Sequence, residues 1–349
     1  MTKYSPQLQR VLDLAATAHE QYEQQAEIRE AFLAATSCGV IIASCMDGRG
    51  RPTRHLGLPL GVATEFRKGG VHLSYASSGF RERLSSIVRE RRDRPDIFFH
   101  VVHDSAEPTR ACGYWKGKGG LQAAMEHGLF LAKRNTQAHQ DELFTVILCH
   151  DTDTDAYSVL DRNVGQFVPI TEMAERFGCM EAAVEYLFPD FPQSVNRDLS
   201  LVFTLHSAYL QTQIKIPPNG KNGHHIEDTI IVGERFAHIA ECKAVFLIDE
   251  KCGGVSGQME IAGRIMTESL LESRISLEGD NRLLLLTQIP WKTDTDSALN
   301  SRNRACAMVG AQDQAARLET IFRNTFPDLA PYLEVRSAVI NERYELELC

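Results

Sequence analysis

Short apolar segments alternate with amphipathic helical segments along this chain, and that alternation restricts the possible folds more than any other feature. Apolar runs at 39–45, 97–103 and 144–149 are separated by helical patterns near 80–93 and 121–133. Runs of this length with helices between them are typical of βαβ units, which build a mostly parallel sheet flanked by helices. We therefore expect an α/β fold, with any site beyond the carboxyl ends of the strands.

The second half of the chain repeats this alternation in a degenerate form. We expect strands at 229–232, 244–248 and 283–286, helices at 259–273 and 309–323, and a polar loop at 300–306. The strand 97–102 and a loop ending Arg110-Ala111-Cys112 are echoed by 283–286 and a loop ending Arg304-Ala305-Cys306, which indicates a degenerate repeat.

A chain of 349 residues is long enough for two domains. Helical spacing at 6–35 predicts an N-terminal helical segment over 1–37, and further helices are expected at 170–177, 180–187 and 199–214. The sequence Pro217-Pro218-Asn219-Gly220 begins the clearest flexible connector. We therefore expect a catalytic zinc domain over 38–216 and a degenerate domain without metal ligands over 224–349.

The segment Cys45-Met46-Asp47-Gly48-Arg49 combines a thiol, a carboxylate and a guanidinium at alternate positions. In an extended chain these three side chains share one face. A thiolate is a zinc ligand, and a carboxylate paired with arginine stays ionised and fixed in direction. A free core cysteine followed by a solvated turn is the alternative.

His103 and Cys112 are the best further ligand candidates, because His103 also ends a predicted strand and Cys112 follows in a long polar loop. With Cys45 they would form a Cys2His zinc site with an open fourth position, as expected of a catalytic zinc. His100 is the rival of His103, but strand alternation places it on the opposite face. In the degenerate repeat, the segment 247–251 corresponds to 45–49 and has no thiol in place. Gln288 or Ile289 corresponds to His103. The second half therefore lacks the ligands, and we expect one site per chain.

Other polar groups are weaker candidates. The adjacent pairs Cys149-His150 and His224-His225 have poor geometry for sharing one ion. The acidic stretch 151–155 lacks the glycine and distal glutamate of an EF-hand, so a turn after a strand is the favoured interpretation over a calcium or magnesium site.

Composition excludes several partners. A net charge of -9 argues against nucleic acid, and the arginine-rich stretch 81–94 is interleaved with acidic residues as on a solvated helix face. No window approaches the roughly 18 apolar residues of a membrane span. Nine cysteines without framework spacing and an N-terminus without a signal-peptide core predict a cytoplasmic protein with free thiols.

The order Cys45-x-Asp47-x-Arg49, histidine, cysteine resembles the signature of the β-class carbonic anhydrases. The long spacing between His103 and Cys112 is similar to that of the divergent carboxysome shell carbonic anhydrases, as are the sequences 151–156 and 230–236. The resemblance covers about residues 38–300 and implies a β-carbonic-anhydrase-like sheet with a degenerate second copy. It also implies a homodimer or higher homo-oligomer and an association with a carboxysome shell or Rubisco.

The resemblance implies that Zn2+ at Cys45, His103 and Cys112 interconverts CO2 and bicarbonate through a zinc-bound hydroxide. Asp47 would orient that hydroxide while Arg49 holds the carboxylate, or would close the site as a fourth ligand. Two alternatives stay open. A non-catalytic zinc-containing scaffold or carboxysome-associated binding protein would bind zinc without hydrating CO2. An enzyme that uses Cys45 as nucleophile with His103 as base would keep its activity on chelation and lose it on alkylation.

Overall fold

The chain forms two compact units, each built around its own sheet. In the computed structural model, residues 4–106, 111–213, 227–239 and 245–349 are described. The sheet-A unit comprises Ala26–Cys45 and Gly50–Gly223, and the sheet-B unit comprises Met1–Gln25, Met46–Arg49 and His224–Cys349. Both sheets are mixed but mostly parallel and are flanked by helices, so the predicted α/β fold class is confirmed.

Sheet A places its described strands in the order β2-β1-β3-β4-β5-β6. The strands are β1 (Gly39–Ser44), β2 (Ala63–Arg67), β3 (Asp96–Asp104), β4 (Leu143–Asp151), β5 (Tyr157–Asp161) and β6 (Gln166–Pro169). The first four are parallel, β5 runs antiparallel to β4, and β6 runs antiparallel to β5. Every residue of β1 is buried between β2 and β3, which explains its continuous apolar sequence.

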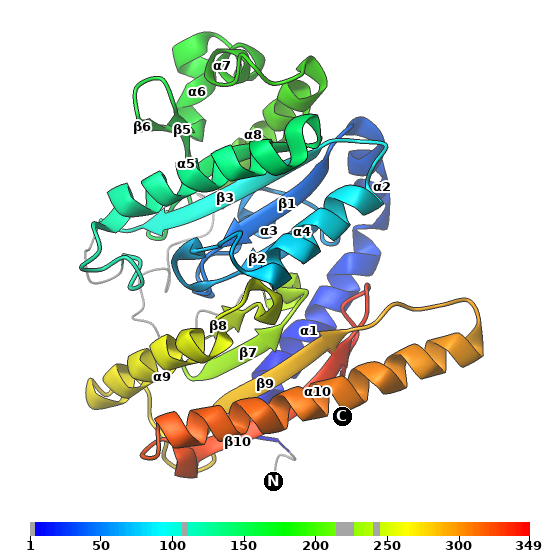
Figure 1. Cartoon of the computed structure of the whole chain (residues 1–349), viewed down its shortest axis with the longest axis vertical. Coiled ribbons are helices and arrows are strands. Elements are labelled where there is room, and N and C mark those ends of the chain that lie inside the picture. The colour runs from blue at the N-terminus through cyan, green and yellow to red at the C-terminus, as the bar shows by residue number, and fades with distance from the viewer. Residues whose placement is uncertain (1–3, 107–110, 214–226, 240–244) are drawn as a thin grey trace. The chain divides into compact units, whose positions relative to one another are not determined.

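Helices cover both faces of sheet A. They are α2 (Ala26–Ala35), α3 (Pro52–His55), α4 (Ser78–Glu90), α5 (Gly120–His139), α6 (Ile170–Phe177), α7 (Met180–Leu187) and α8 (Gln193–Gln213). Val101 packs in a core cluster with residues of α6, α7 and α8, whereas Val102 packs with Ala124 of α5. Strand alternation in β3 therefore directs successive side chains to different helical layers, and Figure 1 shows α5 running along β3.

Sheet B has the strand order β11-β10-β9-β7-β8. The strands are β7 (Thr229–Gly233), β8 (Val245–Ile248), β9 (Leu283–Pro290), β10 (Leu333–Ile340) and β11 (Leu346–Leu348), and the helices are α1 (Pro6–Gln24), α9 (Val255–Leu271) and α10 (Ser297–Thr325). In Figure 1, α10 extends along β9 and β10. Leu8 and Val11 of α1 pack with Ile231 in the core of this unit.

The two sheets share one topology. In each, the strands that follow one another along the chain as first to fifth lie in the spatial order second, first, third, fourth, fifth, with only the fifth antiparallel. Sheet A adds β6 beyond this arrangement. Strand β1 therefore corresponds to β7, and β3 corresponds to β9.

This topology corrects the predicted alignment of the repeat. The counterpart of Cys45 is not the segment 247–251, which lies at the end of β8, but the end of β7 near Gly233 and Glu234. Residues 300–306 were predicted to form a polar loop, but they lie inside α10. Asp296 caps that helix by accepting hydrogen bonds from the backbone N–H groups of Ala298 and Leu299, so the helix begins earlier than its apolar spacing suggests.

The predicted N-terminal segment 1–37 is divided between the units, because α1 belongs to the sheet-B unit and α2 to the sheet-A unit. The predicted connector at 217–223 and the pair His224-His225 lie outside the described residues. None of the helices described here combines the length and the apolar character that crossing a membrane requires.

Candidate metal centre

Three sulfur and nitrogen ligand groups come together at the carboxyl edge of sheet A. Cys45 directly follows β1, His103 is the second-last residue of β3, and Cys112 lies in the segment before α5. A ligand atom of each of these residues lies within 4.8 Å of a ligand atom of the other two. Cys45 is half-buried, and the other two are buried. The structure thus brings together the three residues that the sequence nominated.

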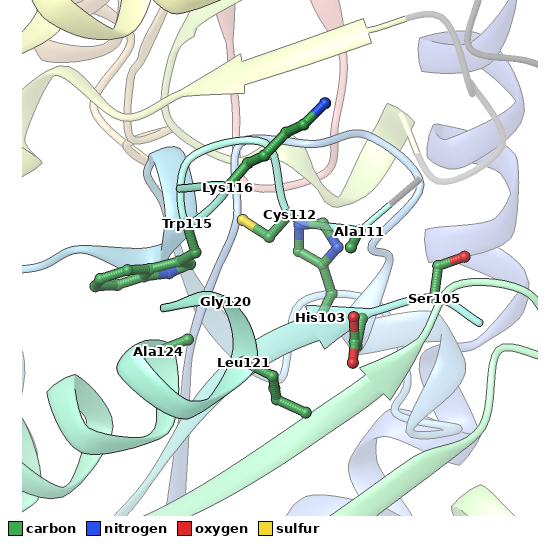
Figure 2. Close-up of a pocket in the computed structure, with 10 residues that line it drawn as sticks. His103, Ser105, Ala111, Cys112, Trp115, Lys116, Gly120, Leu121 and Ala124 are labelled. Atoms are coloured by element: carbon green, nitrogen blue, oxygen red, sulfur yellow. The ribbon is translucent and has the colours of Figure 1, made fainter. Parts of the chain in front are cut away.

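A pocket of about 330 Å³ adjoins His103 and Cys112. Figure 2 shows these two side chains next to each other, with Gly120, Leu121 and Ala124 at the start of α5 below them. The amine of Lys116 extends away from the imidazole in this view. The pocket therefore offers a small space with apolar side chains directly beside the candidate ligands.

Arg67 at the end of β2 fixes the backbone on which Cys45 sits. Its guanidinium donates to the carbonyl oxygens of Cys45 at 3.3 Å and Gly50 at 2.6 Å. It also forms a buried ion pair with Glu65 at 3.0 Å, and Glu65 accepts a hydrogen bond from the Thr53 hydroxyl. A buried guanidinium with all these acceptors holds the start of the loop rigidly.

Gly70 was not singled out in the sequence, yet its backbone N–H donates to the sulfur of Cys45 at 3.3 Å. The residue has φ 61°, and an added Cβ would lie 2.3 Å from the ring of Tyr114. The indole N–H of Trp115 donates to the Gly70 carbonyl at 2.8 Å. Glycine is required here because the backbone must be left-handed and must pass closely beneath two aromatic rings.

The donor set fits a zinc ion. A hydrogen bond with Cys45, followed by burial, raises the pKa of the Cys112 thiol well above its usual range. Two thiols that lie together in a buried place therefore resist deprotonation, and a bound cation would favour their thiolate forms. Two sulfurs and one imidazole nitrogen leave a fourth tetrahedral position for water or substrate.

His100, the rival of His103, faces the other way. It is fully buried against α5, where an added Cβ on Gly128 would lie 2.8 Å from its ring. Burial, together with the charge of His127, lowers the pKa of His100 to about 3. His100 lies outside the group of convergent ligand atoms, as strand alternation predicted.

Asp47 and Arg49 form a bidentate ion pair. The guanidinium Nε of Arg49 donates to both carboxylate oxygens of Asp47, at 3.2 Å to Oδ1 and 3.1 Å to Oδ2, and Nη2 donates to Oδ2 at 2.7 Å. The backbone N–H of Arg49 also donates to Oδ1. Both side chains are 13% exposed. Strand β1 ends at Ser44, and the contacts of Met46–Arg49 lie in the sheet-B unit, where Asp47 forms a β-bridge with Phe246.

A second convergent group, His55, His150 and Asp155, also has its ligand atoms within 4.8 Å of one another. The sequence predicts a turn at 151–155 and presents His150 only as the neighbour of Cys149. The signal that could have found the group is the position of His150 and Asp155 on either side of one turn after a parallel strand.

A scan against protein-family models found no match, and a search of curated proteins found none either.

Proposed function

We propose that this chain is a zinc-dependent carbonic anhydrase that interconverts CO2 and bicarbonate, with Cys45, His103 and Cys112 holding the metal ion. The observation that carries the proposal is the convergence of two thiols and one imidazole at the carboxyl edge of a mostly parallel sheet, beside a small pocket. We also propose that sheet A has the β-carbonic-anhydrase fold and that sheet B is its degenerate second copy, which the shared strand order supports.

When bound, Zn2+ would supply a Lewis acid that lowers the pKa of a water from about 15.7 towards neutrality, so that the water can add to CO2. The chain supplies the surroundings. Leu121 and Ala124 offer apolar surface next to His103, which suits a small neutral substrate. The N–H of Gly70 supports the thiolate of Cys45 by a hydrogen bond.

We propose that a carboxylate oxygen of Asp47 accepts a hydrogen bond from the reacting water. Its position two residues after Cys45 and its bidentate pairing with Arg49 support this role. The arginine keeps the carboxylate ionised and fixes its direction. If Arg49 released it, Asp47 could instead become a fourth ligand and close the site. Homo-oligomer formation and association with a carboxysome shell or Rubisco stay predictions from the resemblance.

The proposal is tested by stopped-flow CO2 hydration on the zinc-loaded protein, with Cys112→Ser and Cys149→Ser in parallel. Cys149 is a suitable control because it is a half-buried thiol of the same sheet outside the convergent group. We expect rapid hydration that is lost in Cys112→Ser and kept in Cys149→Ser. Bound zinc without hydration would favour the scaffold alternative, and activity that survives chelation but not alkylation would favour a cysteine nucleophile.

The pH dependence gives a second check. Two thiolates neutralise most of the charge of a divalent ion, so the site is a weaker Lewis acid than three imidazoles would be. We therefore expect the hydration rate to rise through mildly alkaline pH. A rate that is flat from acid to alkaline pH would contradict the proposed chemistry.

A further inference from the structure

Three other ligand groups converge within the sheet-A unit, from segments far apart in the chain. His55 ends the short helix α3, His150 lies near the end of β4, and Asp155 follows in the turn before β5. Asp155 Oδ1 lies 3.7 Å from Nε2 of His55 and 3.7 Å from Nε2 of His150. Both imidazoles thus present the same nitrogen to one carboxylate oxygen, which leaves a gap that a small ion could bridge.

The environment of His55 needs an explanation. It is fully buried, and neither of its ring nitrogens has a hydrogen-bond partner among the described residues. Leaving a buried polar group unsatisfied costs about 1–3 kcal/mol. A metal ion on Nε2 would give this imidazole a partner without moving α3.

His206 of α8 positions this group without belonging to it. Its Nε2 accepts a hydrogen bond from the backbone N–H of Tyr157 at 3.0 Å, so its Nδ1 carries the proton and donates to the carbonyl of His55 at 2.7 Å. The ring of Tyr157 stacks on His150 with centroids 4.8 Å apart, and Tyr209 stacks on His55 at 5.7 Å. These contacts set the backbone and ring orientation of both imidazoles, as the surroundings of metal ligands commonly do.

The charges near the group act in two directions. Burial lowers the pKa of His55 well below its usual value, and the charges of His150, Arg51 and Arg54 add to this effect, whereas the charge of Asp155 opposes it. Burial alone would raise the pKa of Asp155, but the interactions with His150, His55 and Arg51 outweigh it and hold that pKa below the usual range. The arginines oppose a cation. Burial is the main reason that His55 stays neutral, and the interaction with His150 is the main reason that Asp155 stays ionised; these are the forms that bind metals.

We propose that His55, His150 and Asp155 form a second metal site that holds a divalent first-row transition-metal ion. Two imidazole nitrogens and one carboxylate oxygen suit Zn2+ and its neighbours rather than Ca2+ or Mg2+, which prefer oxygen ligands. The ion clamps the loop after β1 to the turn after β4. His150 is the register partner of His103 in the β3–β4 ladder, so the two metal sites start from neighbouring positions of one sheet.

Cobalt binding separates this site from the cysteine site. A cobalt ion with thiolate ligands shows intense sulfur-to-metal charge-transfer absorption, whereas a cobalt ion on imidazole and carboxylate shows only weak d–d bands. Metal-free Cys112→Ser protein is titrated with Co2+, and the ions bound per chain are counted by elemental analysis. We expect one ion per chain with weak d–d bands, and loss of that ion on adding Asp155→Asn or, separately, His55→Gln.

Asp155→Asn is a mild change, because asparagine tolerates the left-handed backbone that Asp155 adopts at φ 62°. Asp153→Asn in the same turn is the matched control and should keep the ion, because Asp153 instead accepts hydrogen bonds from Ser105 and Ala106. Circular dichroism verifies that each variant is folded. The inference is overturned if folded Cys112→Ser binds no Co2+, or if its ion persists in both Asp155→Asn and His55→Gln. Charge-transfer absorption in the protein with Cys112 intact reports on the proposed zinc site independently.

Discussion

The two sheets share one topology, but the side chains at their carboxyl edges differ. At the edge of sheet A, two thiols and an imidazole converge beside a pocket of about 330 Å³. At the edge of sheet B, a pocket of about 140 Å³ is lined by Glu234, Lys251 and Gln288. Lys251 Nζ lies 2.6 Å from Glu234, and the Gln288 amide donates to the Glu234 carbonyl. A fold of this kind supplies an edge for a site, and the side chains decide whether the edge can bind a metal ion.

Register makes this comparison specific. Ser44 at the end of β1 is paired with Val101, and Gly233 at the end of β7 is paired with Gln288. If the last residues of β1 and β7 are aligned, the counterparts of Cys45 and His103 are Glu234 and Pro290; if the alignment is shifted by one residue, they are Gly233 and Ile289. In either alignment sheet B has neither a thiol nor an imidazole at these two positions. The predicted counterpart of Cys45 was wrong, because 247–251 lies at the end of β8 and not of β7.

The largest expected difference between the two edges is in metal binding and catalysis. Cys45→Ser should remove the zinc ion of the cysteine site and lower CO2 hydration by at least about a thousandfold, because a Lewis acid contributes several kcal/mol to the transition state. The matched variant Cys252→Ser, which replaces a buried thiol of the sheet-B unit, should leave the hydration rate unchanged. The hydration rate is measured by stopped-flow and the zinc content by elemental analysis. Equal losses of hydration rate in both variants would mean that the two edges do not differ in function.

A second large effect should come from the support beneath Cys45. Arg67→Met should lower the free energy of unfolding by about 3–5 kcal/mol, because it leaves the buried carboxylate of Glu65 without its partner. Adding Glu65→Met should restore much of that loss, since removing both charges is far milder. Urea denaturation measures both. If the single and double variants are equally destabilised, the buried ion pair is not the cause.

Acid should weaken the sheet-A unit first. Burial lowers the pKa of His100 to about 3, so below the ordinary histidine value the unfolded chain binds a proton that the folded chain does not. Stability therefore falls as pH falls from about 6.5 towards 3, by about 2 kcal/mol at pH 5 for this residue. His100→Gln should make the pH dependence of the unfolding free energy less steep over that range, while His127, His206 and His55, whose pKa values are also lowered by burial, keep part of the slope. An unchanged slope would show that His100 is not the responsible group.

A smaller effect on rate is expected from Arg49→Lys. Lysine cannot reproduce the bidentate contact that Arg49 makes with Asp47. Hydration should fall about tenfold while zinc content stays the same, because a group that only orients the reacting water is altered. Loss of zinc in this variant would instead assign the pair a role in building the metal site.

The smallest effect is expected at the edge of sheet B. Lys251 is 57% exposed, and exposed ion pairs contribute no more than about 1 kcal/mol. Lys251→Ala should therefore change the unfolding free energy by less than about 1 kcal/mol and leave CO2 hydration unaltered. A clear loss of hydration would reveal a function at an edge for which we predict none.

The local patterns of the sequence predicted much of the fold, because buried strands and amphipathic helices have distinct periodicities. The helices α6 (Ile170–Phe177) and α7 (Met180–Leu187) were predicted with the bounds they have. The strand β2 was missed: Ala63–Arg67 contains Glu65 and Arg67, two charged residues that are buried in the folded chain, where they pair with each other and with nearby polar groups. Such pairing depends on the tertiary fold and leaves no signal in hydrophobicity.

The candidate site shows the same limit. Cys45 and His103 could be nominated because each closes an apolar strand, and parallel strands bring their ends to one edge. Gly70 could not be nominated, because the space for a side chain there is taken by Tyr114 and Trp115, which approach from a distant segment. The group of His55, His150 and Asp155 was missed for a similar reason, since α3 meets the end of β4 only in the folded chain.

Zinc-edge X-ray absorption on Asp155→Asn protein would identify the ligands of the cysteine site, because that variant should retain only the ion of this site. We expect two sulfur ligands at about 2.3 Å and one imidazole nitrogen at about 2.0 Å, with a further light atom completing the tetrahedron. Cys112→Ser in the same background should abolish the signal. A zinc ion with no sulfur ligand, or one held by three or four sulfurs, would contradict the assignment of Cys45, His103 and Cys112.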